Sequence, residues 1–126
     1  MVKGYAGRIL HVDLTSGKLE VENPSEAFYR QYMGGSALGM YYALRHIPAG
    51  ADPLGPENVL IITLGPATGL PISGTSRVTA TARSPLTGAI GDAQAGGFWP
   101  AECKNAGFDA IVIKGRAAKP VYLWLH

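Results

Sequence analysis

The sequence predicts an α+β fold, in which mixed or antiparallel sheets are combined with a few helices. Short apolar or alternating segments are bounded by turn residues, and three segments carry helix start and stop signals. These elements do not alternate regularly as strand, helix, strand. The chain has 126 residues, of which 47% are hydrophobic, so it can bury a real core. We therefore expect residues 1–126 to form a single domain.

The first elements are a hairpin and a helix. Residues 7–14 and 19–22 flank a Thr-Ser-Gly-Lys turn, which is typical of a β-hairpin. Asn23 then precedes a proline and an acidic residue, an arrangement that predicts a helix with Asn23 as its N-cap. Two consecutive glycines should end this helix at about Met33.

A second helix and two strands make up the middle of the chain. Ser36 is expected to cap a helix over residues 37–47, which has apolar side chains at helical spacing. Residues 58–64 are almost continuously apolar, as in a central strand. Residues 77–83 alternate polar and apolar side chains, so one face of this strand should meet the core and the other solvent or a ligand.

The last third of the chain contains one more predicted helix and two predicted strands. Residues 98–105 form a short helix with Pro100 in its first turn. Residues 109–114 and 121–125 are expected to be strands. Because the second of these is apolar and abuts the terminus, it should expose an edge that pairs with another copy, giving a symmetric homo-oligomer.

Charge and hydropathy exclude several classes of partner. The net charge is only +2 and the 11 Lys and Arg residues are dispersed, which argues against nucleic-acid binding. No apolar run reaches the roughly 18 residues that a membrane span needs, and no signal-peptide core is evident. We expect a cytoplasmic protein that does not bind membranes. The single cysteine, Cys103, is expected on the buried side of a helix, because alone it forms no internal disulfide and holds no metal cluster.

The sequence contains none of the standard catalytic motifs. The three histidines, His11, His46 and His126, are scattered, and no zinc-protease, Cys-x-x-Cys, nucleophile-elbow or P-loop motif occurs. We therefore expect no metal held by side chains and no nucleophile paired with a base.

Two glycine-rich segments suggest an anion-binding site. GPATGLPISGTSR ends at Arg77, and GAIGDAQAGGF contains Gly96 and Gly97 directly before the last helix. Bare backbone lets N–H groups approach a ligand, and a guanidinium binds phosphate or carboxylate bidentately. Each feature also has a plainer explanation: Arg77 as a solvated charge, the glycine pair as tight packing, and Asp92 as part of a turn rather than an acceptor for a ring N–H.

Several longer segments together resemble the N-terminal part of the tungsten-containing aldehyde ferredoxin oxidoreductase family, among them YAGRILHVDLTSGK, SPLTG and AGFDAIVIKGRAAKPVYL. The resemblance implies a tungsten or molybdenum bis-pyranopterin cofactor whose phosphates are bridged by magnesium. Arg77 matches the family's cofactor-binding arginine. The residues that match its second loop are Gln94, Ala95, Gly96 and Gly97, where Gln94 replaces the usual Asn and would offer its main-chain carbonyl to the magnesium. GGSALG, residues 34–39, lacks the arginine of the family's GGRGLG and receives no ligand role.

The resemblance also implies a function for the parent protein. By this resemblance, the chain is expected to be the N-terminal cofactor-binding portion of an oxidoreductase. The parent enzyme would convert aldehydes to carboxylic acids and pass electrons through a 4Fe–4S cluster to ferredoxin. The cluster ligands are absent from this chain, so its expected partners are downstream domains or a separate subunit that carries the cysteines. We expect the chain alone to be inactive. The alternative is a non-catalytic anion-binding or assembly subunit on the same scaffold.

Overall fold

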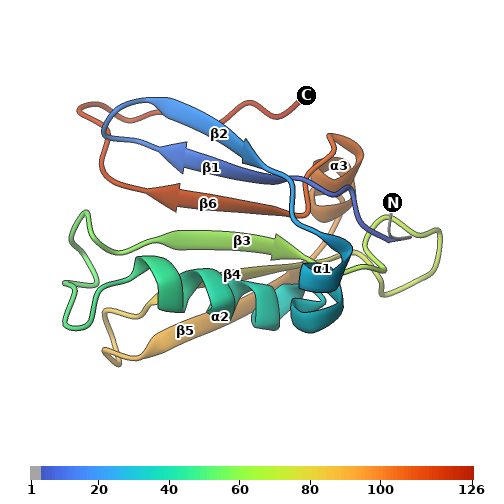
Figure 1. Cartoon of the computed structure of the whole chain (residues 1–126), viewed down its shortest axis with the longest axis horizontal. Coiled ribbons are helices and arrows are strands. Elements are labelled where there is room, and N and C mark those ends of the chain that lie inside the picture. Colours follow the sequence, from blue (N-terminus) through green and yellow to red (C-terminus); the bar gives the residue numbers. More distant parts are fainter. Residues whose placement is uncertain (1–3) are drawn as a thin grey trace.

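The computed structural model describes residues 4–126, which form one mixed six-stranded sheet with three helices (Figure 1). The sheet order is β2-β1-β6-β3-β4-β5, with β1 and β6 parallel and all other neighbours antiparallel. This confirms the predicted α+β fold. Along the chain the elements are β1 (Ile9–Asp13), β2 (Lys18–Glu22), α1 (Glu26–Tyr32), α2 (Gly35–His46), β3 (Leu60–Leu64), β4 (Arg77–Arg83), β5 (Ile90–Gly96), α3 (Trp99–Asn105) and β6 (Ala110–Lys114).

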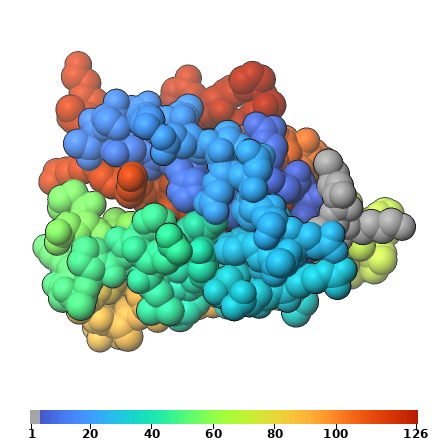
Figure 2. All heavy atoms as spheres, viewed as in Figure 1, coloured from blue at the N-terminus to red at the C-terminus, as the bar shows by residue number. Residues whose placement is uncertain are grey.

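Helices α1 and α2 cover one face of the sheet. Figure 1 shows α2 in front of β4 and β5, and Figure 2 shows this helix side with the β1–β2 hairpin running alongside. The side chains that pack here are buried and apolar, and most come from α2 and from the three strands β1, β3 and β6. They include Ile9, Leu38, Tyr42, Ala43, Ile61, Ala110 and Val112. Burial of this apolar surface is the main stabilising contribution on this face.

Helix α2 lies unusually close to the sheet because glycines replace larger side chains at its contacts. Gly39 touches Thr81 so closely that a Cβ atom would collide with the hydroxyl. Gly34, the N-cap of α2, has a φ of 132° and lies against the carbonyl of Leu64. Thr79 and Thr81 are therefore buried under the helix, so the polar side of β4 faces the core rather than solvent.

Helix α3 and the C-terminal segment cover part of the opposite face. Cys103 of α3 packs with Leu10, Val12 and Ile111, and Leu125 contacts the same cluster. The prediction of a strand over residues 121–125 is wrong, since these residues have irregular structure. The preceding strand, β6, already pairs with β1 and β3, which leaves no open edge beside it. The sheet edges are β2 and β5, so the edge-pairing argument for a homo-oligomer does not apply to residues 121–125.

The glycine-rich second segment is a strand, not a loop. Residues 90–96 pair with the whole of β4, from Arg83 opposite Ile90 to Arg77 opposite Gly96. The prediction that Gln94, Ala95 and Gly96 lie in a loop is therefore wrong.

The starts of the first two helices also differ from their predictions. Ser25, rather than Asn23, caps α1, and its hydroxyl accepts a hydrogen bond from the Phe28 amide. Helix α2 begins at Gly35, one residue before Ser36, and its N-cap Gly34 has no side chain to accept such a bond. The Ser36 hydroxyl is thereby left for another partner.

Candidate anion-binding site

Arg77 lies where the two glycine-rich segments meet. It begins β4 opposite Gly96, and a Cβ atom at Gly96 would lie 3.8 Å from its Nη1 atom. The neighbouring Ser76 hydroxyl donates a hydrogen bond of 2.5 Å to the carbonyl of Gly97. None of the ion pairs within residues 4–126 includes Arg77, and its side chain is exposed. Its positive charge is therefore available to an anion.

The main chain of β5 is open to a ligand at alternate residues. The Ser84 amide bonds to the Ala89 carbonyl at 2.7 Å, which continues the β4–β5 ladder as a hydrogen-bonded pair. Because such pairs alternate with non-hydrogen-bonded ones, the N–H and C=O groups of Gln94 and Gly96 point away from β4. β5 is an edge strand, so these groups face no other strand. The Gln94 carbonyl is free to bind a cation or a polar ligand.

The Gln94 side chain links this edge to helix α2. Its Nε2 atom donates to the Ser36 hydroxyl at 3.3 Å. Gln94 is paired with Thr79, so it lies on the same sheet face as Arg77. The structure thus adds Ser36, which the sequence analysis had expected only as a helix cap, to the surroundings of the candidate site.

Ala95 and the start of helix α3 are poorly placed to bind an anion. Ala95 pairs with Val78, and its side chain lies on the face opposite to Arg77. Helix α3 has seven residues, and Pro100 in its first turn has no N–H to offer an anion. Phe98, the N-cap, separates the helix from Gly97. The structure therefore brings together Arg77, Gln94, Gly96 and Gly97, but gives the helix N-terminus little part in the site.

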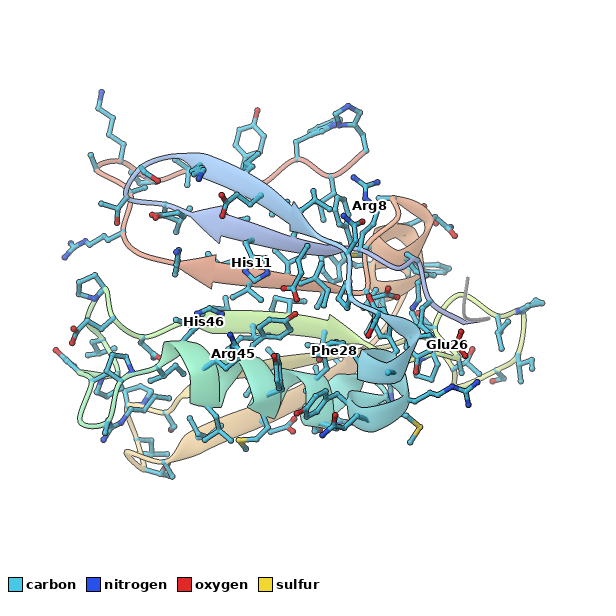
Figure 3. All side chains as sticks on the ribbon, viewed as in Figure 1. Arg8, His11, Glu26, Phe28, Arg45 and His46 are labelled. Carbon is cyan, nitrogen blue, oxygen red and sulfur yellow. The ribbon has the colours of Figure 1, made fainter. Side chains whose placement is uncertain are left out.

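The histidines of β1 and α2 are neighbours but lie in a structural cluster. His11 and His46 have ring centroids 6.0 Å apart. Figure 3 labels both side chains. Glu22 binds both His11 Nε2 at 2.7 Å and the Tyr42 hydroxyl at 2.8 Å. Burial of the imidazole is the main cause that lowers the pKa of His46, and the electrostatic effect of the nearby His11 adds to it. Among the described residues, no group of three His, Cys, Asp or Glu side chains is arranged to hold a metal ion.

An apolar cavity on the other side of the sheet has Glu102 and Cys103 as the ionisable residues of its lining. It has a volume of about 420 Å³ and is lined mainly by apolar side chains, including Ile62, Trp99 and Leu123. Cys103, in its wall, is only 3% exposed, and burial raises the pKa of its thiol to about 11. A buried thiol that stays protonated is a poor nucleophile and metal ligand.

No helix within residues 4–126 has the length and apolarity needed to cross a membrane.

Comparison with known proteins identifies the family. A family model described as the N-terminal domain of aldehyde ferredoxin oxidoreductase matches residues 9–126. The chain belongs to the aldehyde ferredoxin oxidoreductase family. Similarity to individual members agrees: the tungsten-containing aldehyde ferredoxin oxidoreductase of Pyrococcus abyssi is 43% identical over 123 residues. The match covers 98% of this chain and 20% of that relative.

Proteins named for other activities are also similar to this chain. The WOR-like subunit of an aliphatic sulfonate oxidoreductase from Pyrococcus furiosus is 38% identical, with 97% of this chain and 20% of the relative covered. Among solved structures, the active-site complex BamBC of benzoyl coenzyme A reductase, bound to 1,5-dienoyl-CoA, superposes with a TM-score of 0.94. That match has 33% identity and covers 99% of this chain and 19% of the other. The chain thus spans about one fifth of the length of these similar proteins.

Proposed function

We propose that this chain is the N-terminal cofactor-binding portion of a tungsten or molybdenum bis-pyranopterin oxidoreductase that oxidises aldehydes to carboxylic acids, with ferredoxin as electron acceptor. The observation that carries the proposal is the exposed Arg77 guanidinium beside Gly96, at the open edge of β5. Relatives named as tungsten-containing aldehyde ferredoxin oxidoreductases support the choice of metal and substrate.

The residues at this edge fit the periphery of such a cofactor. Pterin phosphates are anionic, and a guanidinium with free N–H groups binds them bidentately. Gly96 and Gly97 leave room beside Arg77 for a phosphate, because nothing but Ser76 and Arg77 itself lies near a Cβ at Gly96 and nothing lies near one at Gly97. The outward carbonyl of Gln94 is an oxygen ligand of the kind that magnesium prefers. Arg77, Gly96 and Gly97 would therefore hold the phosphates and Gln94 the magnesium, with Ala95 as the spacer between them.

The chemistry and the electron path need parts beyond these residues. When bound, the metal with its dithiolene ligands supplies the two-electron oxidation, while the protein binds and orients the cofactor. A 4Fe–4S cluster takes four cysteine thiolates, and this chain has one cysteine, Cys103, which is buried. The cluster would therefore be held by a downstream domain or a separate subunit, which would also meet ferredoxin.

Replacing Arg77 tests the proposed site. In the enzyme purified with this chain in its natural context, we expect Arg77→Ala to lower the tungsten or molybdenum content about tenfold, because charge-assisted hydrogen bonds to a phosphate are lost. Arg77→Lys should restore only part of it, since lysine lacks the bidentate fork. Metal analysis by mass spectrometry is the measurement. Arg83→Ala, at the other end of β4, is the matched control. Full metal content in Arg77→Ala would disprove the role of Arg77.

Activity of the 126-residue chain provides a second test. We expect no turnover of aldehydes with an artificial electron acceptor, because only one edge of the proposed cofactor site is present. The measurement is a dye-reduction assay on homogeneous protein of this length, with metal content determined on the same sample. Turnover by a metal-loaded sample would show that the remaining parts are dispensable.

A further inference from the structure

The loop before Arg77 is closed by one buried hydroxyl group. This loop, residues 65–76, joins β3 to β4, and Thr68 within it is only 5% exposed. Thr68 Oγ1 accepts a hydrogen bond from the Gly65 amide at 3.2 Å. The same oxygen lies 3.2 Å from the Arg77 carbonyl and 3.4 Å from that of Thr75, and its single hydrogen can be donated to either. One side chain thus connects the first residue of the loop to the first residue of β4.

A second hydroxyl fixes the other side of Arg77. Ser76 Oγ donates to the Gly97 carbonyl across the β4–β5 corner. The Arg77 main chain is therefore tied to the start of its own loop through Thr68 and to the end of β5 through Ser76. The exposed guanidinium has no carboxylate partner within residues 4–126, so its position depends on these main-chain anchors.

We propose that Thr68 is a positioning residue for Arg77, which holds the start of β4 so that the guanidinium stays beside Gly96 and Gly97, ready for a phosphate. This inference rests on the proposed function, which makes Arg77 the anion-binding group. If the guanidinium is already held in place, less conformational entropy is lost when the phosphate binds, and the affinity is higher.

The chemistry of the site requires a hydroxyl at residue 68. Valine has the same shape as threonine, but it would leave the partly buried Gly65 N–H and Arg77 C=O without the Thr68 hydroxyl as a partner, which is unfavourable. The loop would then open to let water reach these groups, and Arg77 would move with it. Serine keeps the hydroxyl and should keep the connection.

The test uses the 126-residue chain labelled with ¹⁵N, with inorganic pyrophosphate as the phosphate probe. Pyrophosphate binding is followed by NMR at the Arg77 Nε–H and the Gly97 amide. We expect Thr68→Val to weaken binding about fivefold and Thr68→Ser to stay within about twofold of wild type. The matched control is Thr63→Val, which removes another buried hydroxyl, one that donates to the Gly35 carbonyl at 2.8 Å under α2. It should lower stability without changing pyrophosphate affinity.

A second readout does not depend on binding. In Thr68→Val alone, hydrogen exchange of the Gly65 amide should accelerate and the ¹⁵N order parameter of Arg77 Nε should fall. If both stay at their wild-type values, or if Thr63→Val weakens binding as much as Thr68→Val does, Thr68 does not position Arg77. If wild type and Arg77→Ala bind pyrophosphate equally, Arg77 is not the anion-binding group, and the exchange and order measurements still decide whether Thr68 holds it.

Discussion

Gly34→Ala should destabilise the protein by roughly 4 kcal/mol, because two separate costs fall on the same residue. Its φ of 132° is a conformation that residues with a Cβ atom rarely adopt. The new Cβ would also lie 2.5 Å from the carbonyl oxygen of Leu64, a main-chain atom that no rotamer change can move. Helix α2 would have to withdraw from β3, and chemical denaturation should show a lower midpoint.

A variant at Gly50 separates the cost of the backbone conformation from the cost of the Cβ clash. Gly50 also has a positive φ, 80°, but nothing lies within 4 Å of a Cβ there. Gly50→Ala should therefore carry only the backbone cost of about 1 to 2 kcal/mol. If Gly34→Ala and Gly50→Ala lowered stability equally, the close approach of α2 to Leu64 would contribute nothing.

The regular elements could be predicted from the sequence where packing and local preference agree. The continuous apolar run that forms β3 is an example, since apolar residues tend to be buried. The alternation in β4 predicted the strand, although its threonines rather than its alanines are the buried residues. β5 was missed because Gly, Ala and Asp, which make up most of it, have low strand preference. Its conformation is imposed by pairing along the whole of β4, which is information that lies outside the segment.

The opposite error occurred at residues 121–125. Valine, tyrosine, leucine and tryptophan favour strands, but a strand also needs an open neighbour, and the partners of β6 are already in place. Similarly, Ser36 has the chemistry of an N-cap, yet α2 begins one residue earlier because Gly34 allows the close approach to β3. In both cases a tertiary contact outweighed the local preference.

The candidate site could be predicted in part. Arg77 and the glycines stand out because a cation beside bare backbone is visible in one stretch of sequence. The contacts of Thr68 and Ser36 join residues that are 9 and 58 positions apart, so no local pattern reveals them. A buried threonine inside a glycine-rich loop is the one available signal, since such hydroxyls often bond to nearby main chain.

Asp109 was likewise given no special role, yet its buried carboxylate has hydrogen-bond partners on several elements. Its carboxylate is 1% exposed and accepts four hydrogen bonds, from the amides of Ala6 and Gly7 at 3.0 and 2.7 Å, the Tyr29 hydroxyl at 2.9 Å and Lys104 Nζ at 2.6 Å. Burial is the main cause that raises the pKa of Tyr29, and the negative charge of the Asp109 carboxylate adds to it. The Tyr29 hydroxyl therefore stays protonated and donates its hydrogen bond. Together these contacts fix the segment before β1, helix α1 and helix α3 to one point.

We therefore expect Asp109→Ala to lower the free energy of unfolding by about 4 kcal/mol, because the change leaves buried donors without an acceptor and removes the carboxylate that pairs with the Lys104 ammonium, which keeps only the Gly4 carbonyl. The Lys104 side chain is only 11% exposed, so leaving its ammonium without the carboxylate is costly. The double variant Asp109→Ala/Lys104→Met should therefore lose at least about 1 kcal/mol less stability than the sum of the losses in the two single variants. Denaturant unfolding measures all three variants. Glu26→Ala, which breaks the exposed pair with Arg30, is the control and should cost about 0.5 kcal/mol or less. Two outcomes would contradict this expectation: additive effects of Asp109→Ala and Lys104→Met, or a cost for Asp109→Ala no larger than that for Glu26→Ala. Either outcome would show that water reaches the Asp109 carboxylate and that apolar packing holds the three segments together instead.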